Sequence, residues 1–126
     1  MKETFESILV WHKSTFKRTL AKTQKERFMQ ELVEFDKAID FNHALEELSD
    51  MYISAVGICR FELAIDFLSM VDGYRDELGA SEKELKLAIY KKMAINRQRA
   101  KDNYWAYDEE TKQYVARHKL KNYIDK

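Results

Sequence analysis

Proline is absent from this chain, and this absence constrains the fold more than any other feature of the sequence. The 126 residues also include only three glycines, Gly57, Gly73 and Gly79. Strand-rich folds need many tight turns, and proline and glycine are the residues that such turns most often use. The strong helix formers alanine, leucine, glutamate, lysine, arginine and methionine are plentiful instead. The sequence therefore predicts an all-α fold, an antiparallel bundle of four to five helices.

The first two helices are predicted from apolar spacing and from a capping signal. We expect the first helix over residues 4–20. The second begins at Thr23, which with Glu26 fits a capping box, in which each side chain satisfies a backbone N–H of the first turn. Spacings of three and four then give the second helix a single apolar stripe, made by Phe28, Leu32, Phe35 and Ile39.

A long third helix is predicted over residues 43–72, after a turn near residues 40–42. From Met51 onward this segment is apolar on nearly every side, and such a helix needs neighbours all round. A bundle of this size has few helices to surround it. We therefore expect a homo-oligomer, a dimer or a tetramer, that shares the third helix.

A fourth helix and a C-terminal tail complete the predicted chain. Ser81 and Glu84 form a second capping box, and the helix that they start is expected to end near Lys101. We assign residues 1–103 to the helical domain. Residues 104–126 are expected to form a loop and then a short helix or a tail packed on that domain, with aromatic residues mixed among charges: Tyr104, Trp105, Tyr107, Tyr114 and Tyr123.

The charge balance and the single cysteine narrow the class of protein. The chain has 22 Lys and Arg against 22 Asp and Glu, whereas a general nucleic-acid binder shows a basic surplus. Cys59 has no partner for a disulfide, so nothing indicates an oxidising compartment. The N-terminus lacks the apolar core of a signal peptide, and the longest apolar run contains three charges. We expect a cytoplasmic protein with no membrane or nucleic-acid partner.

Two acidic pairs flank the turn predicted between the second and third helices. Glu31 and Glu34 are three residues apart, as are Glu47 and Asp50, so each pair projects from one face of its helix. Both nested pairings, 31 with 50 and 34 with 47, are centred on the predicted turn near residues 40–42. In an antiparallel hairpin, residues equidistant from the turn lie at similar heights. We therefore expect Glu34 to face Glu47 and Glu31 to face Asp50.

Four carboxylates in one patch repel each other and raise each other's pKa unless a cation lies between them. Mg²⁺ binds carboxylates together with waters and leaves positions open for substrate phosphates. Mn²⁺ would fit the same ligands, and two metals are possible. Acidic pairs at this spacing also occur on solvated helix faces, where they bind nothing. The shared centre of the two pairs favours a metal site.

A basic segment of the fourth predicted helix is the next candidate. Lys92, Asn96 and Arg99 are spaced four and three apart, so they share one face. Lysine offers a point charge and arginine a planar fork for anionic oxygens. Taken alone, such a run is also typical of a solvated face. Beside an acidic metal site, it is a candidate clamp for pyrophosphate.

Trp11 and His12 on the first predicted helix leave two interpretations open. Trp11 has the flat aromatic surface on which a nucleobase stacks. Alternatively, Trp11 belongs to the core and His12 is a polar surface residue. The sequence has no glycine-rich phosphate loop, so any nucleotide site must be built from metal and side chains.

Taken together, these motifs resemble the signature of the MazG-like all-α nucleoside triphosphate pyrophosphatases. The order and spacing of the motifs over residues 8–100 are similar to the small, often phage-associated dATP/dGTP-type branch. The segments that carry the resemblance are Glu31-x-x-Glu34, Glu47-x-x-Asp50 within Ala44-Leu45-Glu46-Glu47-Leu48-Ser49-Asp50, Trp11-x-x-x-Thr15-Phe16, and Lys92-Met93-x-Ile95-Asn96-x-x-Arg99.

The resemblance implies hydrolysis of (deoxy)nucleoside triphosphates to the monophosphate and pyrophosphate, Mg²⁺ on the four acids, and an oligomer of helical bundles. The chain departs from the family at Gln30, where an acid is common, in its short turn between the acidic helices, and in the tail after Asn103. Two alternatives stay open: a helical protein that binds a nucleotide without turnover, and a structural oligomer whose acidic face is solvated. The preferred base and sugar are not predicted.

Overall fold

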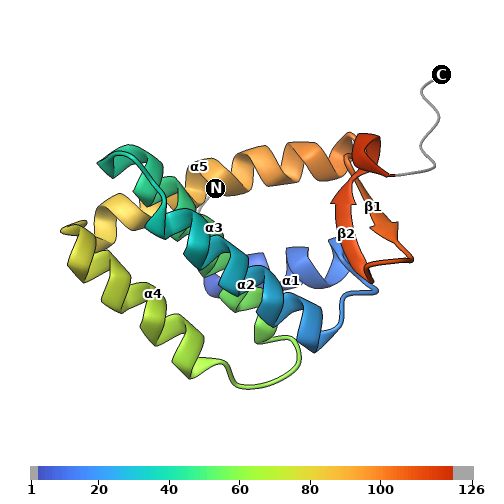
Figure 1. Ribbon diagram of the computed structural model, residues 1–126, viewed down its shortest axis with the longest axis horizontal. Helices are drawn as coiled ribbons and strands as arrows, with labels where there is room; N and C mark the ends of the chain where they lie inside the picture. The colour runs from blue at the N-terminus through green and yellow to red at the C-terminus, as the bar shows by residue number, and fades with distance from the viewer. Residues whose placement is uncertain (1–2, 121–126) are drawn as a thin grey trace.

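The computed structural model describes residues 3–120, and it is mostly helical, as predicted (Figure 1). Tyr123 of the predicted tail lies outside the described residues. No helix in the described part of the chain combines the length and the apolar character needed to cross a membrane. In chain order, the elements are α1 (Phe5–Thr15), α2 (Ala21–Asp36), α3 (Phe41–Ile58), α4 (Ile65–Leu78), α5 (Glu82–Lys101), β1 (Trp105–Asp108), β2 (Gln113–Ala116) and a short 3-10 helix, η1 (Arg117–Lys119).

Helices α2 and α3 form the predicted hairpin, and they make the most extensive helix–helix contact in the described chain. Asp40 caps the start of α3, where its Oδ1 accepts a hydrogen bond of 2.8 Å from the backbone N–H of His43. The turn therefore lies where the sequence predicts it. This hairpin brings the two acidic pairs to the same level of the fold.

The prediction of one long helix over residues 43–72 is wrong, because α3 ends at Ile58 and α4 starts at Ile65. The intervening segment contains Arg60, whose side chain reaches the C-terminal end of α1. Its Nη1 donates to the carbonyl oxygens of Phe16 at 2.7 Å and His12 at 3.4 Å. These carbonyls lie at the C-terminal end of α1, where each also accepts a hydrogen bond from a backbone N–H, that of His12 from Phe16 and that of Phe16 from Thr19. The helix break is thus stabilised by a distant part of the chain.

The apolar part of α3, on which the prediction of an oligomer depends, is covered by the other helices of the same chain. The C-terminal half of α3 is buried on all sides within one chain, from Ile53 through Ile58. It contacts α1, α2, α4 and α5, so the fold itself supplies the neighbours that a uniformly apolar helix needs. Self-association through this helix is therefore not needed to bury it, and the homo-oligomer stays a prediction.

Two further predicted boundaries are wrong by several residues. Helix α1 ends at Thr15 rather than near Leu20. Helix α2 begins at Ala21, so Thr23 is not the capping residue of a box with Glu26. Instead, its Oγ1 accepts a hydrogen bond of 3.3 Å from the backbone N–H of Leu20. The side chain still caps the helix, but from inside the first turn.

The capping box that starts α5 is confirmed, because Ser81 and Glu84 exchange hydrogen bonds of 2.9 and 3.0 Å. Gly79 ends α4 with φ of +81°, a left-handed conformation that glycine adopts without strain.

The tail is neither a loop nor a helix up to Ala116, because β1 and β2 form an antiparallel hairpin in which Trp105 pairs with Ala116. This small sheet was not predicted, but the chain remains mostly helical, consistent with the all-α class. The hairpin lies at the C-terminal end of α5, beside the connection from α1 to α2 (Figure 1). Trp105 of the hairpin packs against the helical core.

Candidate functional site

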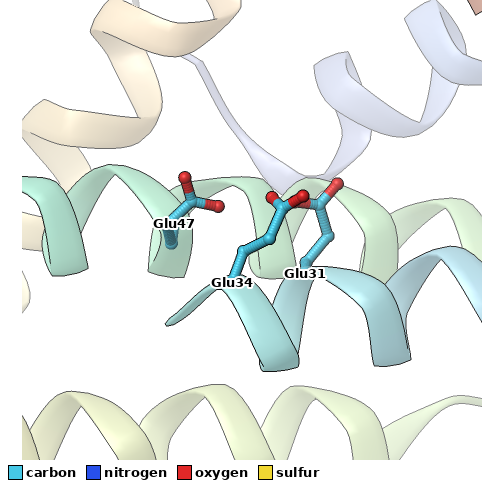
Figure 2. Close-up of side chains that lie close together, drawn as sticks. All are labelled: Glu31, Glu34 and Glu47. Carbon is cyan, nitrogen blue, oxygen red and sulfur yellow. The ribbon is translucent and has the colours of Figure 1, made fainter. Parts of the chain in front are cut away.

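Three of the four predicted acids converge between α2 and α3. Carboxylate oxygens of Glu31, Glu34 and Glu47 all lie within 4.8 Å of one another. Figure 2 shows Glu31 and Glu34 rising from α2 and Glu47 from α3, on the side of both helices that is turned away from α4. Glu34 is exposed, whereas the side chains of Glu31 and Glu47 are only 15% and 14% exposed. The acidic hairpin predicted from the sequence therefore exists as a cluster.

Asp50, the fourth acid, lies beside this cluster and is paired with a cation. Its Oδ1 is 3.6 Å from Nζ of Lys92 on α5. The charge of Asp50 acts on both Glu31 and Glu47. Glu34 and Glu47 have carboxylate oxygens within 4.8 Å of each other, so these two residues face each other as the symmetric spacing predicts.

Three of these acids, Glu31, Glu47 and Asp50, resist ionisation. Burial, and next to it the charge of Asp50, raises the pKa of Glu31 to about 8. Burial and the neighbouring carboxyl group of Glu34 raise the pKa of Glu47 to about 7. Burial also raises the pKa of Asp50, and Lys92 opposes that rise. Clustered carboxyl groups whose pKa values are raised in this way are typical of functional sites.

Two further basic side chains border the cluster, and the sequence analysis missed both. Arg27 Nε lies 3.7 Å from Glu31 Oε1, and His43 Nε2 lies 3.4 Å from Glu47 Oε1. Each base precedes its acid by four residues on the same helix, a spacing that places side chains side by side. This spacing is visible in the sequence, so it is the signal by which Arg27 and His43 could have been found.

A divalent cation fits the acidic cluster on two grounds. Glu47 Oε2 is buried and has no hydrogen-bond partner, which is costly for a carboxylate oxygen. The three ligand oxygens lie within 4.8 Å of one another. Around one octahedral Mg²⁺, neighbouring ligand oxygens are about 3.0 Å apart and opposite ones about 4.2 Å apart, so the cluster is near the size that a single ion requires. The donors are carboxylate oxygens only, which suits hard cations such as Mg²⁺ and Mn²⁺.

A cavity of about 180 Å³ opens beside the acids and is lined by side chains from α1, α2, α3, α5 and the hairpin. Glu31 and Asp50 line it on the acidic side, whereas Glu34 and Glu47 are not part of its wall. All three predicted phosphate-binding residues also line this cavity: Lys92, Asn96 and Arg99. The predicted acidic and basic groups therefore share one space, although they lie on different helices.

Trp11 also lines the cavity, but it is a core residue, only 6% exposed. Its ring packs edge-on against Phe16 and Trp105, with ring centroids 5.3 and 5.9 Å apart. Trp11 thus belongs to an aromatic cluster rather than standing free as a stacking platform. Its Nε1 is buried without a hydrogen-bond partner.

His12 is buried as well, so the alternative that made it a surface residue is wrong. It is 4% exposed, and its Nδ1 lies 3.1 Å from Nη1 of Arg60. Burial, reinforced by the charge of Arg60, lowers the pKa of His12 to about 3. The imidazole is therefore neutral near pH 7 and serves as a hydrogen-bonding group at the base of the cavity.

Three hairpin residues complete the lining, and no sequence argument placed them there: Trp105, Gln113 and Tyr114. They are more than eighty residues away from Trp11 and Phe16 in the sequence. Neither helix periodicity nor motif spacing connects segments so far apart. Comparison of the chain with protein-family models, curated proteins and solved structures finds no match.

Proposed function

We propose that this protein is a Mg²⁺-dependent nucleoside triphosphate pyrophosphatase, which hydrolyses (deoxy)nucleoside triphosphates to the monophosphate and pyrophosphate. One observation carries the proposal: acidic and basic side chains line the same cavity. The acids are Glu31 and Asp50, and the cations are Lys92 and Arg99. A triphosphate with its bound metal needs both kinds of group, because the metal requires carboxylates and the free phosphate oxygens require cations.

The acidic cluster supplies the metal ligands in this proposal. Glu31, Glu34 and Glu47 have oxygens within reach of one ion, and Asp50 is the neighbouring carboxylate. Mg²⁺ held by these residues would supply positive charge to the phosphate oxygens as negative charge develops during phosphoryl transfer. Its charge would also offset the burial and the neighbouring negative charge that together raise the pKa of Glu31 and Glu47.

The reaction adds water across the bond between the α- and β-phosphates. The water oxygen attacks the α-phosphorus, the bond from this phosphorus to the bridging oxygen breaks, and pyrophosphate leaves. The attacking water must lose a proton, and Glu31 and Asp50 are the carboxylates that face the cavity. We assign proton acceptance to one of these two groups, since a general base must lie within hydrogen-bond reach of the water.

The cationic side of the cavity positions the substrate. Lys92 and Arg99 neutralise phosphate oxygens, and the buried amide of Asn96 orients them. Lys92 is already paired with Asp50, so it connects the phosphates to the acids. Trp11 closes the inner wall near the nucleoside.

The test is the release of pyrophosphate from a panel of dNTPs and NTPs, with Mg²⁺ and with EDTA. The purified protein is compared with Glu47→Gln and with Glu46→Gln. Glu46 is the exposed acid next to Glu47, so Glu46→Gln is a matched control for the loss of one charge on α3. We expect release that requires Mg²⁺, is lost in Glu47→Gln and persists in Glu46→Gln.

Two results would overturn the proposal. One is that the unmodified protein releases no pyrophosphate from any nucleotide. The other is that Glu47→Gln hydrolyses as fast as Glu46→Gln, since the acidic cluster would then play no part. Nucleotide-dependent thermal stabilisation without products would instead favour a binding protein. Indifference of the melting temperature to both Mg²⁺ and nucleotides would favour a structural role.

A further inference from the structure

The β1–β2 hairpin forms one wall of the cavity that adjoins the acidic cluster. Trp105 on β1 and Gln113 and Tyr114 on β2 line this cavity, and all three are half-buried. On this wall the ring of Phe16, just after α1, contacts the rings of Trp105 and Tyr114. The ring centroid of Phe16 lies 4.8 Å from that of Trp105 and 5.1 Å from that of Tyr114. These three rings form the aromatic surface of this wall.

The hairpin is fastened to the connection between α1 and α2 by a single arginine. Arg18 Nη1 forms an ion pair of 2.8 Å with Glu109 in the hairpin turn, and its guanidinium lies 3.9 Å from the ring centre of Tyr107. The backbone N–H of Arg18 donates to the hydroxyl oxygen of Tyr114 at 3.0 Å. These contacts hold the aromatic surface in place beside the cavity.

The cavity is chemically different at its two ends. Lys92 pairs with Asp50 at the acidic end, and Arg99, the second cation assigned to the phosphates, lies over the ring of Tyr104 where the charged part of the cavity approaches the hairpin. Seven residues separate Lys92 from Arg99, which corresponds to about 10 Å along α5. The charged end is suited to phosphates. The hairpin end offers aromatic rings and the neutral amide of Gln113, which suit a flat, polar-edged ring.

We propose that the β1–β2 hairpin recognises the nucleobase, with Gln113 hydrogen-bonding to the edge of the base and the rings of Phe16, Trp105 and Tyr114 contacting its face. This inference rests on the proposed function insofar as the ligand is a nucleoside triphosphate whose phosphates lie at the acidic end. A side-chain amide both donates and accepts hydrogen bonds, so it recognises a base edge without adding charge. The hairpin then supplies the specificity, and α2, α3 and α5 supply the chemistry.

The test separates the base from the phosphates by comparing two ligands. Calorimetry with Mg²⁺ measures the Kd of α,β-methylene nucleoside triphosphates with each of the common bases, and the Kd of inorganic tripolyphosphate, which has no base. The variants are Gln113→Ala and Trp105→Leu, with Trp105→Phe to retain a ring. Thr111→Ala, an exposed substitution in the hairpin turn, is the matched control. Circular dichroism checks that each variant is folded.

We expect Gln113→Ala to weaken binding of the preferred nucleotide about five- to tenfold, as for the loss of one hydrogen bond. Trp105→Leu should weaken it about tenfold or more, through lost aromatic contact, with partial recovery in Trp105→Phe. Binding of tripolyphosphate should not change in any variant. Thr111→Ala should match the unmodified protein with both ligands.

The inference is overturned if Gln113→Ala and Trp105→Leu bind nucleotides as tightly as the unmodified protein does, or if binding of the nucleotide and of tripolyphosphate weakens equally. Loss of pyrophosphate release is a separate result. A protein that releases pyrophosphate but shows no effect of the hairpin variants retains the proposed function and loses this inference. A protein that binds nucleotides through the hairpin but never hydrolyses them loses the proposed function and retains the inference. Absence of nucleotide binding overturns both.

Discussion

Lys92 on α5 and Asp50 on α3 form an ion pair that joins the acidic and basic parts of the candidate site, with Nζ 3.6 Å from Oδ1. Both side chains are mostly buried, 21% and 24% exposed, so solvent screens the pair only in part. Burial raises the pKa of Asp50, and the charge of Lys92 opposes this rise. Lys92 thus favours the ionised form of Asp50 and at the same time lines the cavity.

We expect Lys92→Met to weaken nucleotide binding at least tenfold, because a cation that contacts phosphate oxygens contributes on the order of 1–3 kcal/mol. The substitution should also lower the free energy of unfolding by about 1 kcal/mol at pH 7, since Asp50 loses its partner beside other acids. Calorimetry and urea denaturation measure the two effects. Lys91→Met removes an exposed charge from the preceding position and should change neither quantity. Equal nucleotide affinities in the two variants would contradict the role of Lys92.

Metal affinity should rise steeply with pH. In the metal-free protein the pKa of Glu31 is about 8 and that of Glu47 about 7, so near pH 7 a cation must displace protons to reach the carboxylates. Each displaced proton steepens the dependence toward about tenfold per pH unit below the pKa of its group. We expect the Kd for Mn²⁺ to fall from pH 6 to pH 8 and to level off above pH 8.

Calorimetry in buffers with different ionisation enthalpies checks this expectation, because it also measures the protons released. Glu31→Gln should bind Mn²⁺ more weakly and release fewer protons near pH 7. A Kd that is constant from pH 6 to pH 9, with no proton release, would show that Mn²⁺ does not bind the buried carboxylates.

The stability of the metal-free protein should decrease as pH rises, and Glu31 should account for much of the decrease. Its pKa is raised from 4.5 to about 8 in the folded state. Between these values the folded state holds a proton that the unfolded state has lost, so the free energy of unfolding falls as pH increases through this range. We expect Glu31→Gln, which cannot ionise, to be more stable than the unmodified protein at pH 8 by about 1–3 kcal/mol.

Urea denaturation in EDTA from pH 5 to pH 9 tests this expectation. The Glu31→Gln curve should be flatter but not flat, because the pKa of Glu47 and of Asp50 is also raised. Glu26→Gln, an exposed substitution on the same helix, should reproduce the unmodified curve. If Glu31→Gln and Glu26→Gln have the same stability at pH 8, the repulsion inferred for the acidic cluster is absent. Saturating Mg²⁺ should reverse the order of stabilities if Glu31 is a ligand.

The acidic cluster was predictable from the sequence because its geometry is local. Helical periodicity places Glu31 beside Glu34 on α2, and a short turn brings α3 alongside, so the symmetric spacing about the turn is sufficient to place Glu47 opposite. The same reasoning found the shared face of Lys92 and Arg99, since both lie in one uninterrupted helix.

The break between α3 and α4 and the β-hairpin were not predictable in this way. The connecting segment, residues 59–64, contains neither proline nor glycine. It is stabilised by hydrogen bonds from Arg60 to the end of α1, which is more than forty residues earlier. The hairpin turn has no Asn-Gly or Asp-Gly pair, and the position with φ of +61° is occupied by Lys112. In both places tertiary contacts determine a conformation for which the local sequence carries no signal.

Gly57 tests the packing beneath the cavity, because this glycine lies inside α3 where alanine favours a helix. A Cβ at Gly57 would lie 2.5 Å from Nε2 of Gln24 and 2.5 Å from Nε2 of His12, two buried side chains that line the cavity. Gln24 Nε2 also donates to the carbonyl oxygen of Ser54 at 2.9 Å, so it cannot move without losing that hydrogen bond.

We expect Gly57→Ala to lower the free energy of unfolding by about 1–3 kcal/mol, the usual cost of overpacking. Gly73→Ala on α4, where a Cβ meets nothing within 4 Å, should instead raise it by about 0.5–1 kcal/mol. Urea denaturation of both variants measures the difference, and stabilisation by Gly57→Ala would show that the close packing of His12 and Gln24 against α3 is wrong.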